Sequence, residues 1–247
     1  MRKPGARIHS CPGKPVLLKG LHHVTCVCSD AQRTIDFYRD RLGFSLVKKT
    51  VNFDDPHSYH LYVGDETGSP GTLLTFFEWP RAGRGRLGRG TFESIGLATR
   101  TVDEDTAVED PDGLRLRLYP GDSAALRDVV ALGNPDLYAG LFDGDAPLSF
   151  GEPVEETALV GAGTTHHVAW RTAGDDELGL RPTAPQDRKY FRSVYFRMPD
   201  GILAEIATDG PGFLVDEPRE TLDRGLSLPP WLEAERSTLE RELSPIT

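Results

Sequence analysis

Two pairs of adjacent histidines stand in similar surroundings, LHHV at residues 21–24 and THHV at residues 165–168. A lone acidic residue, Glu205, follows within the apolar segment ILAEIAT. Two neutral imidazoles and one carboxylate form the facial triad of non-haem iron enzymes, which leaves coordination positions open for substrate and oxygen. We therefore predict that His23, His167 and Glu205 bind a metal ion, with Fe(II) preferred and Mn(II), Ni(II) or Zn(II) as alternatives.

The position of Glu205 follows from a β-hairpin predicted around Pro199-Asp200-Gly201. Two alternating segments, 190–198 and 202–208, flank this turn, as in a tight hairpin. A three-residue loop with Gly201 in the left-handed conformation places Tyr195 directly opposite Glu205. The carboxylate then lies within a sheet, where an unpaired charge is costly unless it binds a cation or a metal.

The first histidine pair lies in a predicted strand, Leu18–Cys28, which opens a strand-helix-strand-strand-strand unit. We expect the helix to begin with a capping box formed by Ser29 and Gln32 and to end near Gly43. Three strand-like segments follow, at residues 44–53, 58–64 and 72–79. The unit therefore places one histidine pair on the first strand of a sheet.

A second Pro-Asp-Gly turn, at residues 111–113, repeats the turn of the hairpin described above. If the two turns are superposed, Arg117 occupies the position of Glu205, so this internal copy keeps the hairpin without the carboxylate. After this copy, the sequence indicates a short helix at residues 123–132.

Several longer motifs resemble one enzyme family. They are LHHVT at 21–25, VKKTVNFDDPHSYHLYVGDETGSPGTLLTFFEWP at 47–80, THHVAW at 165–170, RKYFRSVYFRMPDGILAEIATDGPGF at 188–213 and LPPWLE at 228–233. Together they resemble the ring-cleaving dioxygenases that act on para-hydroquinones. Those enzymes belong to the vicinal oxygen chelate superfamily, with glyoxalase I, the bleomycin-resistance proteins and the extradiol catechol dioxygenases. The resemblance implies an α+β fold, in which βαβββ modules form curved, barrel-like mixed sheets around a metal site.

The resembling enzymes have four strand-helix-strand-strand-strand modules, and this chain departs from them: its second and fourth modules lack their helix and its third is largely missing. We therefore expect five parts and a reduced helix content. These parts are an N-terminal extension at 1–17, a complete first module at 18–80, a degenerate second module at 81–120, a connector or remnant third module at 121–160, and the metal-binding last module with a C-terminal helix at 161–247. All three residues of the metal triad belong to the first and last modules. The triad can therefore form even though the middle modules are shortened.

The resemblance also implies roles for individual residues. It assigns metal binding to the second histidine of each pair and to Glu205, and it places five further residues in the surrounding pocket: His22, Thr25, His166, Arg188 and Tyr195. An arginine and a tyrosine can bind oxygen atoms of a substrate by hydrogen bonds. An imidazole can act as general acid or base near neutral pH.

The catalytic assignment of His22 and His166 has an alternative. Side chains alternate along a strand, which points these two histidines away from the face that carries the metal ligands. Either imidazole can therefore support a ligand or pack in the core instead of contacting the substrate. For His60, which belongs to the segment DDPHSYHLY, we favour a structural role.

The charge and the cysteine content of the chain limit the kinds of molecule it is expected to bind. A net charge of -10 argues against nucleic-acid binding, which requires clustered Lys and Arg. Three cysteines are too few for a disulfide framework, and the N-terminal segment has no apolar stretch, so we expect a cytoplasmic protein without signal peptide or membrane span. The expected partner is a small aromatic substrate, with a homodimer as one option for assembly.

The leading hypothesis is an Fe(II)-dependent dioxygenase that cleaves the ring of a hydroquinone-like aromatic diol, with O2 as co-substrate. Two alternatives remain open at this point. One is another metal-dependent reaction, an isomerisation, lyase reaction or oxidation of a small oxygenated metabolite. The other is a non-catalytic binding or resistance protein.

Overall fold

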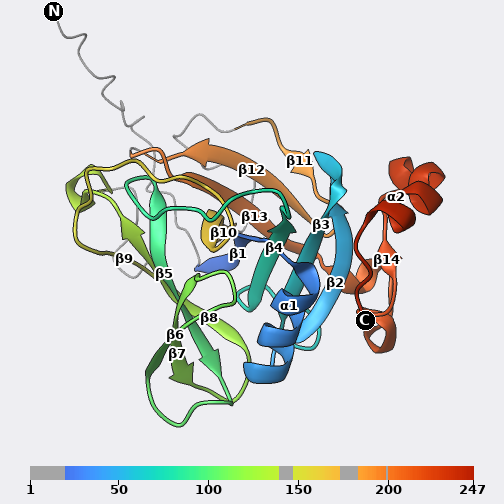
Figure 1. Cartoon of the computed structure of the whole chain (residues 1–247), viewed down its shortest axis with the longest axis horizontal. Coiled ribbons are helices and arrows are strands. Elements are labelled where there is room, and N and C mark those ends of the chain that lie inside the picture. The colour runs from blue at the N-terminus through green and yellow to red at the C-terminus, as the bar shows by residue number, and fades with distance from the viewer. Residues whose placement is uncertain (1–19, 139–146, 173–182, 199) are drawn as a thin grey trace, which may run out of the picture.

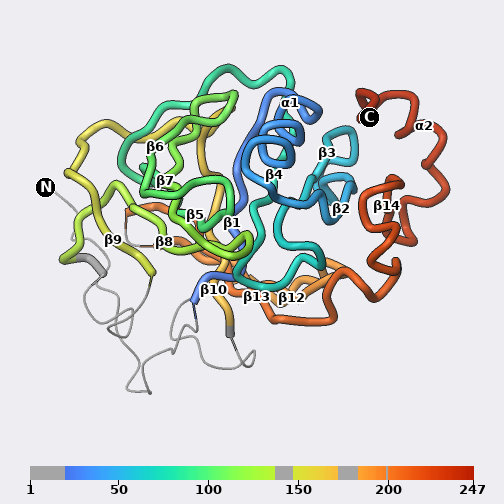
Figure 2. The backbone as a smooth tube through the Cα atoms, turned by 90° about the horizontal axis from the view of Figure 1, so that it is seen from below, coloured from blue at the N-terminus to red at the C-terminus, as the bar shows by residue number. Residues whose placement is uncertain are grey.

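The computed structural model describes residues 20–138, 147–172, 183–198 and 200–247, and every element and contact given below lies within these ranges. The expected N-terminal extension at 1–17 and Cys11 fall outside them. The described residues form a nine-stranded sheet and a five-stranded sheet (Figure 1). Figure 2 shows the same two parts from below, with the C-terminal segment at the end of the molecule far from β9.

The large sheet has the strand order β11-β12-β13-β10-β1-β4-β3-β2-β14. Its strands are β1 (Leu21–Cys28), β2 (Ser45–Asn52), β3 (Asp55–Gly64), β4 (Leu73–Glu78), β10 (Thr164–Thr172), β11 (Gln186–Asp187), β12 (Phe191–Arg197), β13 (Leu203–Pro211) and β14 (Leu226–Ser227).

The two histidine-bearing strands, β1 and β10, are neighbours at the centre of this sheet. They pair antiparallel, with Thr25 opposite His167. On the other side of β10, β13 pairs in parallel and sets Glu205 opposite Ala169. Both histidine pairs and Glu205 therefore lie on three adjacent strands, although His22 and Glu205 are 183 positions apart in the sequence.

The predicted hairpin is confirmed. Tyr195 of β12 lies opposite Glu205 of β13, and Gly201 in the connection has a φ of 94°. Only glycine adopts such a left-handed conformation without steric cost. The turn therefore fixes which residues of β13 face Tyr195.

The helix of the first module lies between β1 and β2 and covers the large sheet (Figure 1). It consists of α1 (Ala31–Asp36) and a π-helical continuation, η1 (Phe37–Arg41). The capping box predicted for Ser29 is wrong, because the side chain of Asp30 caps the helix and accepts the amide of Arg33. Ser29 instead donates its hydroxyl to Asp112, and the acidic partner outcompetes the helix end for this side chain.

The five-stranded sheet has the order β6-β7-β5-β8-β9. It comprises β5 (Thr91–Thr99), β6 (Thr106–Glu109), β7 (Arg115–Pro120), β8 (Ala125–Leu132) and β9 (Leu148–Phe150). The short helix predicted at 123–132 is wrong, because this segment is β8, paired antiparallel with β5. Val129 and Ala131 alternate into the core, so the edge of β5 and this period of two outweigh local helix propensity.

Arg117, the residue at the position equivalent to Glu205, ion-pairs with Asp128 of β8 at 2.7 Å. The copy of the hairpin thus carries a surface ion pair where the last module carries its buried carboxylate.

The C-terminal segment lies along the edge of the large sheet at β14 (Figures 1 and 2). The helix expected there is a 3-10 helix, η5 (Pro230–Glu235), followed by α2 (Arg236–Glu242). Its apolar face is buried through Leu232, Leu239 and Leu243. Three short 3-10 turns complete the described elements: η2 (Pro135–Tyr138), η3 (Phe213–Val215) and η4 (Arg219–Thr221).

A curled mixed sheet with two α-helices among the described residues confirms the predicted α+β class with reduced helix content. Cys26 and Cys28 are buried free thiols. Over the described part of the chain, no helix combines the length and apolar character needed to cross a bilayer.

Candidate metal centre

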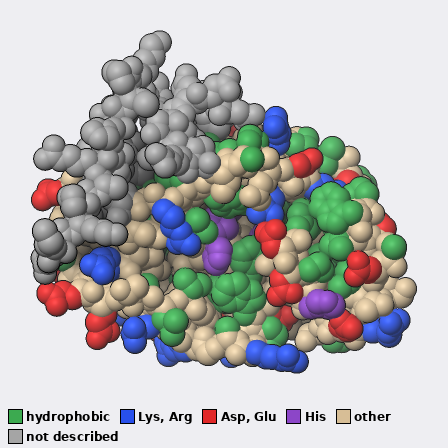
Figure 3. Space-filling model, turned by 90° about the horizontal axis from the view of Figure 1, so that it is seen from above, with side chains coloured by type: hydrophobic (Ala, Val, Ile, Leu, Met, Phe, Trp, Pro, Cys, Tyr) green, Lys and Arg blue, Asp and Glu red, His purple; other side chains and the backbone are tan. Residues whose placement is uncertain are grey.

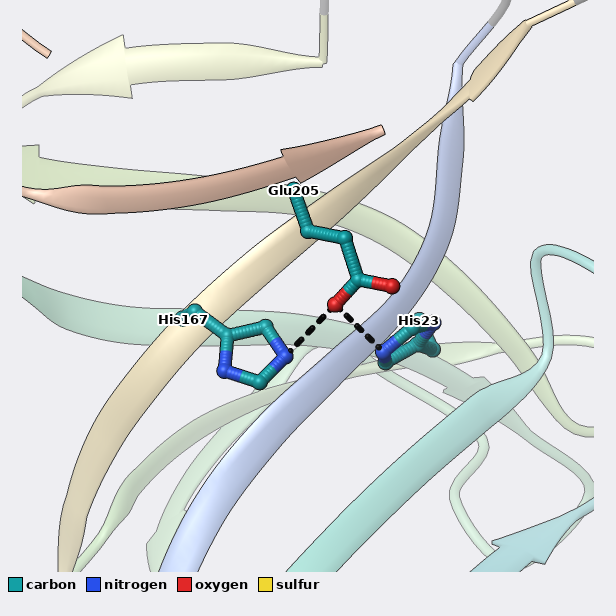
Figure 4. A group of neighbouring side chains, drawn as sticks. All are labelled: His23, His167 and Glu205. Atoms are coloured by element: carbon teal, nitrogen blue, oxygen red, sulfur yellow. Dashed lines mark ion pairs between the residues drawn. The ribbon is translucent and has the colours of Figure 1, made fainter. Parts of the chain in front are cut away.

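His23, His167 and Glu205 converge on one buried point beneath the centre of the large sheet (Figure 4). Oε2 of Glu205 lies 2.8 Å from Nε2 of His167 and 3.4 Å from Nε2 of His23. Ligands bound at right angles about 2.1 Å from a metal are themselves about 3 Å apart. The spacing of the three donor atoms therefore matches that of a metal site.

The two oxygens of Glu205 have different surroundings. Oε1 accepts a short hydrogen bond from the hydroxyl of Ser193 on the neighbouring strand β12. Oε2 is buried and makes no hydrogen bond of acceptable geometry, although both imidazoles point at it. A buried carboxylate oxygen without a hydrogen bond is costly, so Oε2 has the properties of a ligand that awaits a cation.

The carboxylate at this point is buried and charged. Burial would raise the pKa of Glu205, but His23 and His167 outweigh it and hold the pKa well below its usual range, so the carboxylate is ionised. Burial lowers the pKa of His167, although Glu205 opposes this shift, so the imidazole stays neutral near pH 7. The side chain of Glu205 is 0% exposed, and a buried anion favours a bound cation.

A hydrogen-bond chain fixes the tautomer of His23. Nε2 of His22 lies 3.1 Å from the carbonyl oxygen of Thr208, which can only accept, so this nitrogen carries the proton. Burial, and then His23, lowers the pKa of His22 to about 3, so Nδ1 of the neutral ring is an acceptor. This Nδ1 lies 2.9 Å from Nδ1 of His23, which must therefore donate.

When the His23 ring carries a single proton, the donor role of Nδ1 leaves a lone pair on Nε2. That lone pair faces Oε2 of Glu205, an arrangement that is repulsive unless a cation lies between the two atoms. Metal-bound histidines commonly donate their other ring N–H to an acceptor that orients the ring. The residues present therefore fit a divalent metal ion held by two imidazole nitrogens and one carboxylate oxygen.

The second histidine pair repeats the contact with one difference. Nδ1 of His166 lies 2.8 Å from Nδ1 of His167, but no described carbonyl receives its Nε2. His166 instead lines the cavity above the triad, with its ring edge-on to Phe77 and Trp79. Burial, and then His167, lowers the pKa of His166 to about 3. In the first pair, Nε2 of His22 is therefore bound to a backbone carbonyl. In the second pair, His166 faces the cavity.

A cavity of about 340 Å³ opens directly onto the three donor atoms. Figure 3 looks into this hollow, with histidine side chains among apolar ones. Aromatic rings form much of its wall: Phe53, Tyr62, Phe77, Trp79, Phe191 and Tyr195. A volume near the lower end of ordinary ligand pockets and such a lining suit one substituted aromatic ring.

Arg188 and Tyr195 lie together in this cavity. Nε of Arg188 donates to the Tyr195 hydroxyl at 3.1 Å, and its Nη1 donates to Asp54 at 3.2 Å. Burial, and then Glu205, raises the pKa of Tyr195 above its usual value. The phenol therefore stays protonated at neutral pH and retains a proton to donate toward the cavity.

Two residues predicted for the pocket lie elsewhere. His22 and Thr25 are buried and are not part of the cavity wall. His22 acts behind His23 as described above, because strand alternation turns it to the other face. The hydroxyl of Thr25 accepts from Thr75 at 2.8 Å, which directs it toward the neighbouring strand.

His60 is a residue of the cavity wall that the sequence did not single out for the site. Because the Thr75 hydroxyl donates to Thr25, it must accept from Nε2 of His60, 3.0 Å away. Nδ1 of His60 then accepts from the Tyr62 hydroxyl at 3.0 Å. Both ring nitrogens are occupied, so His60 offers the cavity an aromatic surface. The only signal in the sequence was its place in the motif DDPHSYHLY.

Comparisons with known proteins show which family the chain resembles. Residues 20–109 match the family model described as Glyoxalase/Bleomycin resistance protein/Dioxygenase superfamily. A Bacillus subtilis protein named "Putative ring-cleaving dioxygenase MhqA" is 31% identical over 313 aligned positions, which cover 93% of this chain and 99% of that protein. The chlorohydroquinone/hydroquinone 1,2-dioxygenase of Sphingobium indicum is 29% identical over 314 positions, covering 93% and 97%. Both alignments contain more positions than this chain has residues, so this chain lacks segments that the relatives contain.

Solved structures show the same relationship. A crystal structure titled "putative dioxygenase" from Bacillus subtilis superposes with a TM-score of 0.82 at 31% identity, covering 94% of this chain and 98% of that one. Glyoxalase I from Zea mays superposes with a TM-score of 0.53 at 15% identity, covering 76% and 92%. The second likeness is one of fold alone.

Proposed function

The chain belongs to the glyoxalase/bleomycin resistance protein/dioxygenase superfamily, and from this premise we propose that it is an Fe(II)-dependent ring-cleaving dioxygenase. The substrate proposed is a hydroquinone-like aromatic diol, and O2 is the co-substrate. The observation that carries the proposal is Oε2 of Glu205, a buried anionic atom that two imidazoles face and that no hydrogen bond satisfies.

Two observations support the substrate class. The relative from Sphingobium indicum is named for chlorohydroquinone and hydroquinone. In this chain the cavity wall combines aromatic side chains with polar ones, among them Arg188 and Tyr195 near the triad. Such a cavity favours a flat ring with a hydroxyl group directed at the donor atoms.

The ligand set suits ferrous iron, which, bound by His23, His167 and Glu205, would supply a path for electrons from the diol to O2. The protein positions the ligands so that one face of the triad opens to the cavity. The aromatic side chains of the wall lower the polarity next to that face, which strengthens the polar contacts made there.

His166 is assigned the role of hydrogen-bond donor to the oxygens of the substrate. For His167 to use Nε2 as a ligand atom, its Nδ1 must hold the proton and donate it in a hydrogen bond to Nδ1 of His166, 2.8 Å away. The neutral His166 ring then carries its proton on Nε2, at the cavity wall. An imidazole N–H at this place can donate a hydrogen bond to an oxygen of the substrate.

Arg188 and Tyr195 are assigned to binding and charge stabilisation. The guanidinium can bind a phenolic or anionic oxygen of the substrate. The Tyr195 hydroxyl, which accepts from Arg188, can donate to an oxygen that gains negative charge during the reaction.

An oxygen-uptake assay tests the proposal. Protein loaded anaerobically with Fe(II) should consume one O2 for each hydroquinone and insert both oxygen atoms of 18O2 into a ring-opened product. The same protein loaded with Zn(II) serves as the control and should consume none. Turnover of a small oxygenated metabolite without O2, by the zinc or nickel form, would instead support the alternative isomerase or lyase reaction.

A further inference from the structure

A strained turn lies next to Arg188. The amide of Tyr190 donates to the carbonyl of Arg188 at 2.8 Å, which closes a three-residue turn centred on Lys189. Lys189 has a φ of 69° and is the one non-glycine residue with positive φ in the described part of the chain. A γ-turn with positive φ is rare and strained for a residue with a side chain.

The side chain of Lys189 is held by contacts away from the cavity. Its Nζ lies 2.5 Å from Oδ2 of Asp216 and donates to the carbonyl of Leu228 at 3.2 Å. Its own amide donates to Asp187 at 2.7 Å. These contacts fix the central residue of the turn at its backbone and at the tip of its side chain.

Asp216 ties this turn to the body of the sheet. Its Oδ1 accepts from Nζ of the fully buried Lys48 at 3.1 Å. Its Oδ2, which Lys189 contacts, also accepts from the Tyr190 hydroxyl at 3.1 Å. Burial would raise the pKa of Asp216, but Lys189 and Lys48 outweigh it and keep the pKa below its usual range. The ionised carboxylate of Asp216 thus anchors the turn, because it binds both Lys189 and Tyr190.

Consecutive residues of the turn point in opposite directions as a result. Arg188 extends into the cavity toward Tyr195 and Asp54, whereas Lys189 and Tyr190 extend to Asp216. If the turn relaxed to a negative φ at Lys189, the peptide before it would rotate. The guanidinium of Arg188 would then leave its place over the Tyr195 ring, 5.2 Å from the centroid.

We propose that Lys189 is a positioning residue, whose left-handed turn, anchored by Asp216, aims Arg188 into the substrate cavity. Strained backbone persists only where surrounding contacts over-determine it, and such strain concentrates at functional sites. The importance of this aim for catalysis rests on the proposed function, but the placement of Arg188 does not.

Glycine and alanine at position 189 separate this role from a purely structural one. Both substitutions remove the ammonium and its ion pair. Only glycine adopts positive φ without cost, so Lys189→Gly keeps the turn, and Lys189→Ala favours its relaxation. If the ammonium served stability alone, the two variants would behave alike. Lys189→Asn offers a second test, since Asn tolerates this conformation better than other residues with a side chain.

The first readout needs no substrate. Modification of Arg188 by phenylglyoxal, followed by peptide mass spectrometry, reports how well its guanidinium is held. We expect Lys189→Ala to label about threefold faster or more, whereas Lys189→Gly and Lys189→Asn stay within about twofold of the wild type. Equal rates in the alanine and glycine variants would overturn the proposal.

The second readout is the affinity for hydroquinone in the Fe(II) protein without oxygen, measured by calorimetry. Lys189→Ala should weaken binding about tenfold and Lys189→Gly less than threefold, and neither change should matter in an Arg188→Gln background, because coupled residues are non-additive. An unchanged loss in that background would contradict action through Arg188. If hydroquinone does not bind the wild type, the proposed function fails, and the labelling experiment still decides the role of Lys189.

Discussion

His22 donates from Nε2 to the carbonyl oxygen of Thr208, 3.1 Å away, and therefore presents an acceptor to His23. Substitution of His22 by Leu removes this acceptor. The His23 ring can then carry its proton on either Nδ1 or Nε2. We expect the affinity for Fe(II) or Zn(II) to fall about 10- to 100-fold, the usual cost of losing an outer partner of a metal-bound histidine. Competition with a chelator measures this loss.

The control for His22→Leu is His57→Leu, which removes an exposed histidine paired with Glu242 and should leave metal affinity unchanged. His22→Gln, which retains a side-chain acceptor, should recover part of the loss. Unchanged affinity in a folded His22→Leu protein would contradict the tautomer assignment.

Ser193 is a second predicted determinant of metal affinity. Its hydroxyl holds Oε1 of Glu205 and so directs Oε2 at the histidines. Ser193→Ala should weaken metal binding about tenfold without loss of the fold, as measured by a chelator titration and by thermal unfolding. Ser94→Ala in the five-stranded sheet, where Ser94 accepts from Arg117, is the matched control. An equal effect of both substitutions on affinity would count against a role for Ser193 at the metal.

Tyr195→Phe should separate catalysis from metal binding. The change removes the hydroxyl that Arg188 contacts but none of the three metal ligands. We expect kcat to fall about 100-fold, the usual cost of losing a donor to developing negative charge, with the metal affinity unchanged. A normal kcat in steady-state oxygen uptake would exclude the donor role assigned to this phenol.

Asp110 gives a pH dependence unrelated to the metal. It is buried, and its Oδ1 accepts the amides of Asp112 and Leu114. Burial raises the pKa of Asp110 to about 6, above the value near 3.9 of an unfolded chain. Protonation of Asp110 therefore stabilises the folded state. The contribution of Asp110 to the free energy of unfolding is on the order of 2–3 kcal/mol. It is fully present below about pH 4 and is lost as pH rises to about 6.

Asp110→Asn keeps an acceptor for the two amides and removes the titration. Its free energy of unfolding relative to wild type should therefore rise between pH 4 and pH 7. Urea denaturation at both values measures the difference, with the exposed Asp105→Asn as control. A difference that is constant with pH would show that Asp110 titrates normally in the folded state.

The sequence predicted the parts of the site that depend on local rules. The register of Tyr195 and Glu205 follows from the glycine turn between β12 and β13. The fold class and the family were predicted from the motifs around the two histidine pairs and are confirmed.

Long-range packing accounts for what was missed. The segment 123–132 becomes β8 only because β5 offers an edge for pairing. Asp30 replaces Ser29 as the cap because Asp112, distant in sequence, binds Ser29. His60 lies in the cavity wall on β3 and contacts Thr75 of the neighbouring strand β4. Thr75 also binds the hydroxyl of Thr25, which is directed at that strand and not at the cavity.

A titration of the wild-type protein and of Glu205→Ala with Fe(II) under anaerobic conditions tests the central claim most directly. Wild-type protein should bind one ion per chain. Glu205→Ala should keep the folded sheet but bind no iron, while Glu93→Ala, in the other sheet, should bind as wild type. Full iron binding by folded Glu205→Ala would contradict the assignment of His23, His167 and Glu205 as the metal centre.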